Sequence, residues 1–214
     1  MKILLKHNKL YPVSFMAHLD VLRAVTRIIR RAALPVAFSQ GYSPHMKLFF
    51  NQPLPLAVES RAEYLSVELE ENISPEEFLR RYNGEAPVGM EAVSATESDV
   101  NPASETDSAL YFAKIRLSAA QTDVLREIAE KKEFFVTYAQ KDKTVTKDVR
   151  DQIGDLSAGD GGIYMKLAAG NVNLRADRFM NAFCEMAGAE YFIGDIIRLE
   201  QYSKGTALCD IKRE

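Results

Sequence analysis

Four arginines recur at helical spacing within the first fifty residues of the chain. At 100° per residue they fall within about 100° of one another, and an apolar stripe falls on the opposite side. Guanidinium groups bind phosphate oxygens in pairs, stay charged at any accessible pH and stack on bases. The spacing therefore predicts a helix that presents an anion-binding face, most simply for RNA. The arginines are Arg23, Arg27, Arg30 and Arg31, with Asp20 among them; the stripe is Val21, Val25, Ile28, Ile29 and Ala32.

The charge of the chain is segregated along the sequence. Residues 1–50 hold eight Lys or Arg and one acid, a net charge of +7, whereas residues 59–107 hold thirteen acids and three Arg, a net charge of −10; the whole chain sums to −3. This segregation predicts an anionic partner for the basic segment. Two other interpretations stay open. The arginines could form an ordinary solvated helix face, or they could pair with the acidic segment of the same chain.

Two histidines flank the predicted helix, His18 at its start and His45 in a glycine-containing turn. A neutral His18 could act as a base and His45, beside Lys47, as an acid in a metal-independent reaction on RNA. That chemistry requires the two rings to converge; otherwise His18 is a capping or core residue and His45 an ordinary loop residue. The turn also offers a positive-φ glycine and hydrogen-bond donors to an anion. Its candidate binding residues are Gln40, Gly41, Ser43, His45 and Lys47.

Several common sites are missing from the sequence. It contains no CxxxCxxC for the iron–sulfur cluster of a radical SAM enzyme, no phosphate-binding P-loop and no dinucleotide fingerprint, so we expect no cofactor in this chain. The histidines with Asp20 have poor spacing for a metal, and Cys184 and Cys209 match no metal or redox motif. No apolar run is long enough to span a bilayer, and the N-terminal run is too short for a signal peptide. We therefore expect a cytoplasmic protein with reduced thiols and no membrane contact.

The elements that must position these residues follow a β-α-β-β-α-β order in the first half of the chain. The helix should end at Leu34-Pro35, since the residue before proline disfavours helical geometry, and a second helix should begin after the cap Ser74. The predicted strands span 2–7, 36–40, 47–50, 63–70 and 90–96, and the predicted helices run from 18 to 33 and from 75 onward.

The second half predicts the same order of elements. Its strands are 109–117, 133–139, 161–169 and 195–203, its helices are 119–132 and 177–188, and 146–153 is ambiguous. The expected fold class is therefore α+β, with two tandem ferredoxin-like modules built on antiparallel sheets. We place the modules at 1–100 and 108–214 and a polar, acidic linker at 97–109.

The two segments around the arginine helix also carry a resemblance to a known family. The run F-x-x-H-L-D-x-x-R-x-x-x-R-x-x-R-R-A-x-L-P-V-A-x-S-Q-G-Y-S-P-H, from Phe15 to His45 and continuing to Leu54-Pro55-Leu56, resembles the radical-SAM-linked protein family of unknown function. Ala17 and Met46 depart from the Ser and Pro that relatives usually carry. The family motif corresponds here to His18, Asp20, Arg23, Arg27, Arg31, Ser39, Gln40, Gly41, Pro44 and His45.

What the resemblance implies is a separate radical SAM protein as partner and a role related to RNA. Combined with the arginine face, it favours an RNA-binding accessory protein without catalytic activity of its own. Two alternatives remain: an adaptor that docks the radical SAM partner, and an RNA-acting enzyme that uses His18 and His45. The sequence makes no prediction of oligomeric state.

Overall fold

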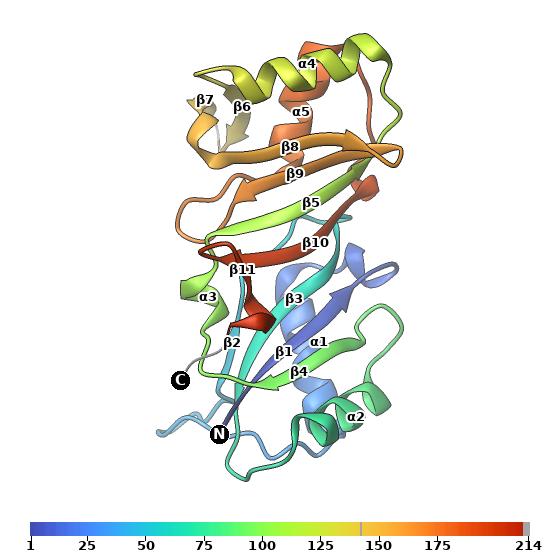
Figure 1. Ribbon diagram of the computed structural model, residues 1–214. Helices are drawn as coiled ribbons and strands as arrows, with labels where there is room; N and C mark the ends of the chain where they lie inside the picture. Colours follow the sequence, from blue (N-terminus) through green and yellow to red (C-terminus); the bar gives the residue numbers. More distant parts are fainter. Residues whose placement is uncertain (142, 212–214) are drawn as a thin grey trace. The chain divides into compact units, whose positions relative to one another are not determined.

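The structure is a computed structural model that describes residues 1–141 and 143–211, and these form two compact units (Figure 1). Unit 1 comprises Met1–Thr106 together with the described residues from Tyr202 onward, and unit 2 comprises Asp107–Gln201. The end of the described chain therefore belongs to unit 1, whereas the sequence predicted it in the second module. No helix in the described ranges is both long and apolar enough to cross a membrane.

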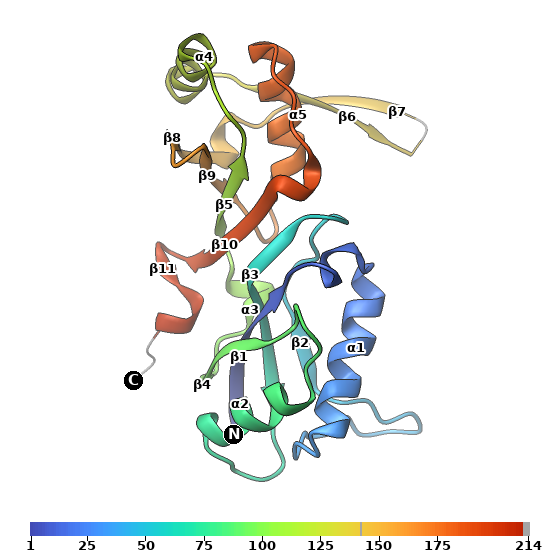
Figure 2. The same ribbon diagram turned by 90° about the vertical axis from the view of Figure 1, so that its right-hand side faces the viewer.

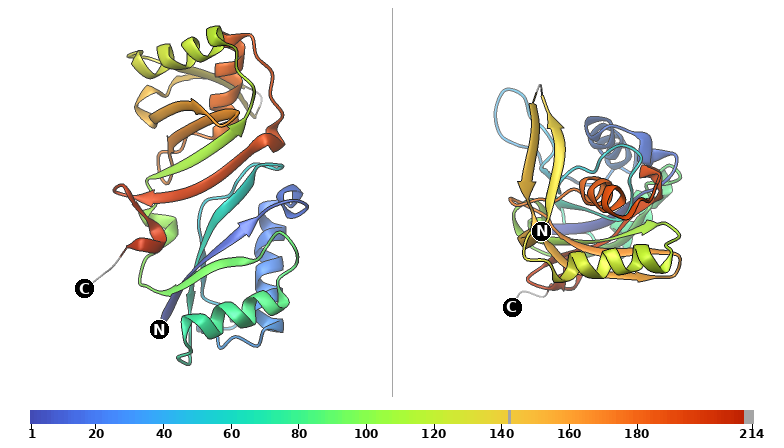
Figure 3. Two further views of the ribbon diagram at one scale, coloured as in Figure 1. Left: turned by 45° about the vertical axis from the view of Figure 1, so that its right-hand side comes forward. Right: turned by 90° about the horizontal axis from the view of Figure 1, so that it is seen from above.

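Unit 1 is a sheet with two long helices on one face (Figure 3). Its strand order is β4-β1-β3-β2, and each neighbouring pair is antiparallel. This mixed, antiparallel architecture confirms the α+β class. In chain order the elements are β1 (Lys2–Lys9), α1 (His18–Arg31), β2 (Leu48–Phe50), β3 (Glu59–Glu68), α2 (Pro75–Glu85), β4 (Ala92–Glu97), α3 (Pro102–Glu105) and β11 (Thr206–Ala207).

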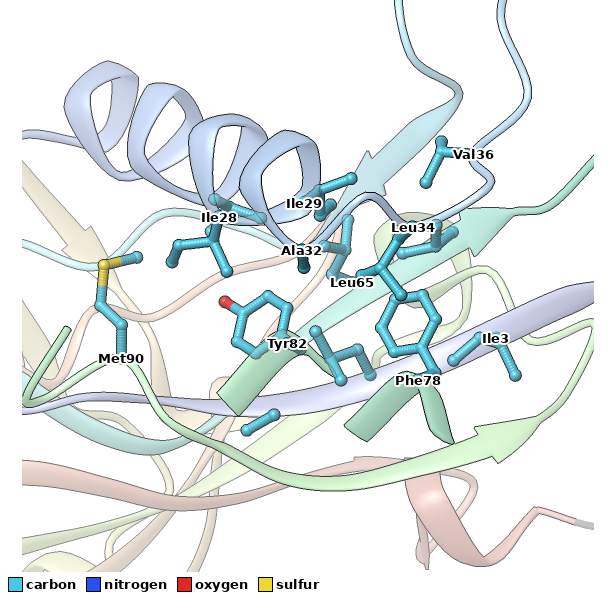
Figure 4. Close-up of a cluster of buried hydrophobic side chains, with 14 of the residues drawn as sticks. Ile3, Ile28, Ile29, Ala32, Leu34, Val36, Leu65, Phe78, Tyr82 and Met90 are labelled. Atoms are coloured by element: carbon cyan, nitrogen blue, oxygen red, sulfur yellow. The ribbon is translucent and has the colours of Figure 1, made fainter. Parts of the chain in front are cut away.

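Strand alternation explains the core of unit 1. Successive side chains of a strand point to opposite faces, so Ile3 and Leu65 face the helices while Leu4 and Tyr64 face away. Figure 4 shows the helix side of this core, where Ile28 and Ile29 of α1 meet Phe78 and Tyr82 of α2. The other sheet face is closed by Val100 and Leu208, which explains why the last described segment folds with unit 1.

The first-half elements agree with the sequence except between residues 36 and 40. Helix α1 ends at Arg31, ahead of Leu34-Pro35, and α2 starts after Ser74, whose hydroxyl accepts a hydrogen bond from the Glu77 backbone N–H at 3.1 Å. Residues 36–40 make only isolated bridges, Val36 with Leu69 and Phe38 with Met46, because the chain bends back on itself there.

The predicted linker at 97–109 contains structure. The short helix α3 lies within it, and both Val100 and Thr106 are buried. The Asn51 side-chain amide donates to the Thr106 hydroxyl at 2.8 Å, and that hydroxyl donates to the Pro102 carbonyl. These contacts hold in place a segment that its polar composition predicted to be a linker.

Unit 2 has the strand order β10-β5-β9-β8 plus a separate two-stranded hairpin, β6-β7. The predicted strand at 133–139 forms, but it pairs only with β7 and leaves its expected place in the sheet to β8. Strand β8 was missed because most of its residues are exposed and its sequence, IGDLSAG, shows no alternation of apolar and polar side chains. The elements are β5 (Ser108–Lys114), α4 (Ala119–Glu130), β6 (Phe135–Gln140), β7 (Lys143–Asp148), β8 (Ile153–Gly159), β9 (Gly162–Ala168), α5 (Ala176–Ala187) and β10 (Ile196–Ser203).

Candidate functional site: the arginine face of α1

Helix α1 divides into a buried and a charged side. The apolar residues Val21, Val25, Ile28 and Ile29 are buried against the sheet, while Arg23, Arg27, Arg30 and Arg31 are all exposed. The helix end is held from α2: the Arg81 guanidinium donates to the Ala32 carbonyl at 2.9 Å and also to the Ala33 carbonyl. Arg81 thereby satisfies two backbone carbonyls just after the end of α1 and ties this end of the helix to α2.

The four arginines differ in their partners. Arg23 pairs with Asp20 on its own helix at 3.0 Å, and Arg31 pairs with Glu85 at the end of α2 at 2.7 Å. Across residues 1–141 and 143–211, Arg27 and Arg30 form no ion pair. Because exposed pairs contribute about 0–1 kcal/mol, a phosphate can compete for Arg23 and Arg31 as well.

A shallow groove of about 360 Å³ runs beside these arginines, between α1 and α2. Arg27 and Arg31 border it on the α1 side and Glu85 on the α2 side. Small side chains on both helices keep it open, which leaves room for the two guanidinium groups to reach a ligand. The remaining lining residues are Ala24, Ile28, Gly84, Ala86 and Pro87.

The acidic segment neutralises only part of the basic one. Besides Arg31–Glu85, Lys47 pairs with Glu68 at 2.7 Å, and this pair is about two-thirds buried on each side. Lys47, a candidate anion ligand, is thus engaged within unit 1. In the part of the chain that the structure describes, acidic side chains do not cover the arginine face: Arg27 and Arg30 stay exposed, and Arg27 borders an open groove.

The glycine-containing turn is an ordered loop with an exposed tip. Ser39 and His45 face each other across it: the Ser39 backbone N–H donates to the His45 carbonyl at 2.8 Å, and the His45 N–H donates to the Ser39 hydroxyl at 3.1 Å. That hydroxyl also lies 2.8 Å from Nδ1 of His45. The tip residues Gln40, Gly41, Tyr42 and Ser43 are exposed, and Gly41 has φ 122°, a conformation that favours glycine.

His18 and His45 lie at opposite ends of unit 1. The loop of His45 is tied to the Glu68 end of β3, because the Ala37 N–H donates to the Glu68 carbonyl at 2.8 Å. Helix α1 begins at the other end of the sheet, and its 14 residues span about 20 Å. Figure 2 shows this loop beside the C-terminal end of α1, which is the end of the helix closer to the chain's N-terminus. The structure does not bring the two imidazoles together as an acid–base pair.

Comparison with known proteins identifies the family of the chain. Residues 2–176 match the family described as uncharacterized protein conserved in bacteria (DUF2344). The chain belongs to this family. A search of curated proteins found no match. The match to DUF2344 includes the arginine helix, the glycine turn and most of unit 2, and so extends beyond residue 110, where the resemblance seen in the sequence weakened.

In this DUF2344 protein, the sequence-predicted site divides into three parts. Arg23, Arg27, Arg30 and Arg31 share one helix face with Asp20; Gln40, Gly41, Ser43 and His45 share the loop at the far end of that helix; and His18 stands apart at the near end. Within residues 1–141 and 143–211, no group of three or more His, Cys, Asp or Glu side chains is placed to hold a metal ion.

Two residues of the site were not found from the sequence. Glu85 is the partner of Arg31, and Arg81 caps α1, but both lie on α2, far along the chain. Their roles follow from the packing of the two helices over one sheet face. A predicted β-α-β-β-α-β order could have suggested that α1 and α2 are neighbours, but not which residues meet.

Proposed function

We propose that this protein is an RNA-binding accessory protein that holds an anionic substrate, RNA in the first instance, on the exposed face of α1. The observation that carries the proposal is that Arg27 and Arg30 are exposed and form no ion pair among the described residues, while Arg27 and Arg31 border a groove. A cationic face of this kind binds phosphates, and arginine does so with two N–H groups at once.

The proposal includes a partner. The motif from Phe15 to His45 resembles that of radical-SAM-linked proteins, so we propose that a separate radical SAM enzyme acts on the RNA held here, in the cytoplasm. On this proposal the chemistry and its cofactors belong to the partner, and this chain contributes binding and orientation.

We also propose that units 1 and 2 are tandem ferredoxin-like modules. In support, the four main strands of unit 1 lie in the order fourth, first, third, second, and β10-β5-β9-β8 repeats that order in unit 2 once the β6-β7 hairpin is set aside. The hairpin is then an insertion between α4 and β8.

The alternative of an RNA-acting enzyme is weaker on geometric grounds. It needs His18 and His45 within reach of one phosphate, and the length of α1 separates them by about 20 Å. An adaptor that docks the radical SAM enzyme remains a competing function, and it predicts association with that enzyme after nuclease treatment.

Fluorescence anisotropy with labelled tRNA tests the proposal. For wild-type protein, about four phosphate contacts predict a log–log salt slope of about −3. The double variant Arg27→Ala/Arg30→Ala should bind about 10–100-fold more weakly, with the slope reduced in magnitude by about 1.5. If both affinity and slope stayed at their wild-type values, the arginine face would not be the RNA site.

A matched control is available on unit 2. Arg126 is an exposed arginine of α4 that pairs with Asp123 at 2.7 Å, as Arg23 pairs with Asp20 on α1. Arg126→Ala removes one positive charge from the chain without touching the proposed face. It should leave the affinity within about twofold, because long-range charge is screened at physiological salt.

A further inference from the structure

Exposed aromatic side chains lie at the start of the arginine helix. Tyr11 is 70% exposed and Phe15 56% exposed, and their rings meet edge to face with centroids 6.3 Å apart. Leu19, in the first turn of α1, is 63% exposed. Two exposed rings in contact, with an exposed leucine close by in the chain, form an apolar patch that a ligand can cover.

The exposed rings directly precede the arginine helix in the chain. Leu19 stands one helical turn before Arg23, and Arg27 and Arg31 follow at the same interval, about 6 Å per step along the helix. The helical spacing places Leu19 in line with the row of guanidinium groups, and the aromatic pair precedes this row in the chain. Single-stranded nucleic acid fits this combination, since its backbone follows a row of cations and its unpaired bases stack on aromatic rings.

We infer that the RNA bound by this protein is single-stranded and that its bases stack on Tyr11 and Phe15 while its phosphates follow the arginines of α1. This inference rests on the proposed RNA-binding function and adds the class of RNA. A duplex buries its base faces within its own stack, so it can use the arginines but not the rings.

Two aliphatic side chains give the patch a second interpretation. Leu56 and Val88 are exposed, and their neighbours Ala57 and Gly89 hydrogen-bond to Ser14 and Leu10 beside the rings. Aliphatic groups of this kind also suit a protein partner. The row of guanidinium groups adjoining the patch favours RNA, and protein docking becomes an outcome of the test.

The experiment compares oligo(U) with an RNA hairpin of equal length, both labelled for anisotropy. Wild-type protein should prefer oligo(U). Tyr11→Ala/Phe15→Ala should weaken oligo(U) binding about tenfold or more, because each base stack contributes about 1–3 kcal/mol, while the salt slope stays unchanged. Phe192→Ala, at a 60% exposed ring of unit 2, is the matched control and should have no effect.

A spectroscopic variant separates stacking from a structural effect of truncation. The chain contains no Trp, so Tyr11→Trp introduces a single reporter at the patch. Its fluorescence should be quenched by oligo(U) and not by the hairpin, at concentrations where both RNAs bind.

The outcomes distinguish this inference from the function on which it rests. Equal affinity for oligo(U) and hairpin, with no loss in Tyr11→Ala/Phe15→Ala, would overturn stacking and leave RNA binding by the arginines intact. Failure of wild-type protein to bind either RNA would overturn the proposed function itself. Loss of a protein partner in Tyr11→Ala/Phe15→Ala with unchanged oligo(U) binding would assign the patch to protein docking and overturn the inference.

Discussion

Helices α1 and α4 occupy corresponding places in the two units, each following the first strand of its sheet, yet their exposed faces differ. Helix α1 carries four arginines and one acid; α4 carries one arginine, Arg126, and three acids, Asp123, Glu127 and Glu130. Both bury an apolar stripe of similar kind, Ile28 and Ile29 in α1 and Leu125 and Ile128 in α4. A helix that follows the first strand of its unit can therefore pack on the sheet without carrying a cationic face.

The difference teaches that the charge of α1 is not a requirement of folding. A solvated helix face normally mixes signs, as α4 does with its Asp123–Arg126 pair. Arg30 and Arg31 also lie in the last turn of α1, where cations are favourable to the helix dipole by about 0.3–1 kcal/mol, but that does not account for Arg23 and Arg27. The proposed RNA ligand would account for this excess of arginine.

Both helices bury an apolar stripe, and substitutions in this stripe should have the largest effect, a loss of stability. Ile29→Ala in α1 and Ile128→Ala in α4 each remove a fully buried side chain and should lower the free energy of unfolding by about 2–5 kcal/mol. Urea denaturation followed by circular dichroism measures this. A loss below about 1 kcal/mol in either variant would mean that the stripe of that helix is not part of a close-packed core.

The chemistry of the cation should matter as well as its charge. Arg27→Lys/Arg30→Lys keeps both charges but removes the bidentate forks, so RNA affinity should fall by about tenfold while the salt slope stays near that of wild type. Anisotropy across a salt series measures both quantities. Lysine variants that bind as well as wild type would reduce the role of the face to net charge.

Two tyrosines, Tyr82 in the core of unit 1 and the partly buried Tyr191 of unit 2, differ in the partners of their hydroxyl groups. The buried Tyr82 hydroxyl of unit 1 has no hydrogen-bond partner among the described residues, whereas the Tyr191 hydroxyl of unit 2 donates to Asn181 Oδ1 at 2.8 Å. Burial raises the pKa of both, that of Tyr191 to about 12.

Replacing each tyrosine with phenylalanine should show how much its hydroxyl group contributes to stability. Tyr82→Phe should leave the free energy of unfolding unchanged or raise it by up to about 1 kcal/mol, while Tyr191→Phe should lower it by about 1 kcal/mol. Urea titration of the two variants side by side measures the difference. A destabilised Tyr82→Phe would indicate a buried water or another partner for that hydroxyl.

The smallest effect on RNA affinity is expected for the ion pair between Arg31 of α1 and Glu85 of α2. Glu85→Gln removes the partner of Arg31 and a negative charge from the groove, so RNA affinity should rise about threefold with little change in stability, as expected for an exposed pair. Glu127→Gln on α4 is the matched control and should change affinity less. Weaker binding by Glu85→Gln would show that Glu85 orients Arg31 for its ligand.

The sequence predicted what depends on local pattern. The amphipathic spacing of α1, its end before Leu34-Pro35 and the Ser74 cap of α2 each rest on neighbouring residues, and each is found. Helix α5 likewise ends at Ala187 and is capped by Gly188 at φ 58°, within one residue of the end at 188 that the sequence predicted.

What the sequence could not supply depends on tertiary contacts. The exposed strand β8 shows no alternating pattern, so β6 was placed in the sheet where β8 lies. The separation of His18 from His45 follows from the length of α1 and the attachment of the loop at Glu68. The pairing of Arg31 with Glu85 requires two helices to meet, which no local pattern encodes.

The central claim, that RNA binds along α1 and not at the corresponding helix of unit 2, is tested most directly by a two-dimensional NMR titration with oligo(U). The amide and arginine side-chain signals of Arg23, Arg27 and Arg30 should shift in proportion to binding and recover at high salt, while those of Arg126 and its neighbours on α4 stay in place. Shifts confined to α4 or to the β6-β7 hairpin, with the α1 signals unmoved, would contradict the account.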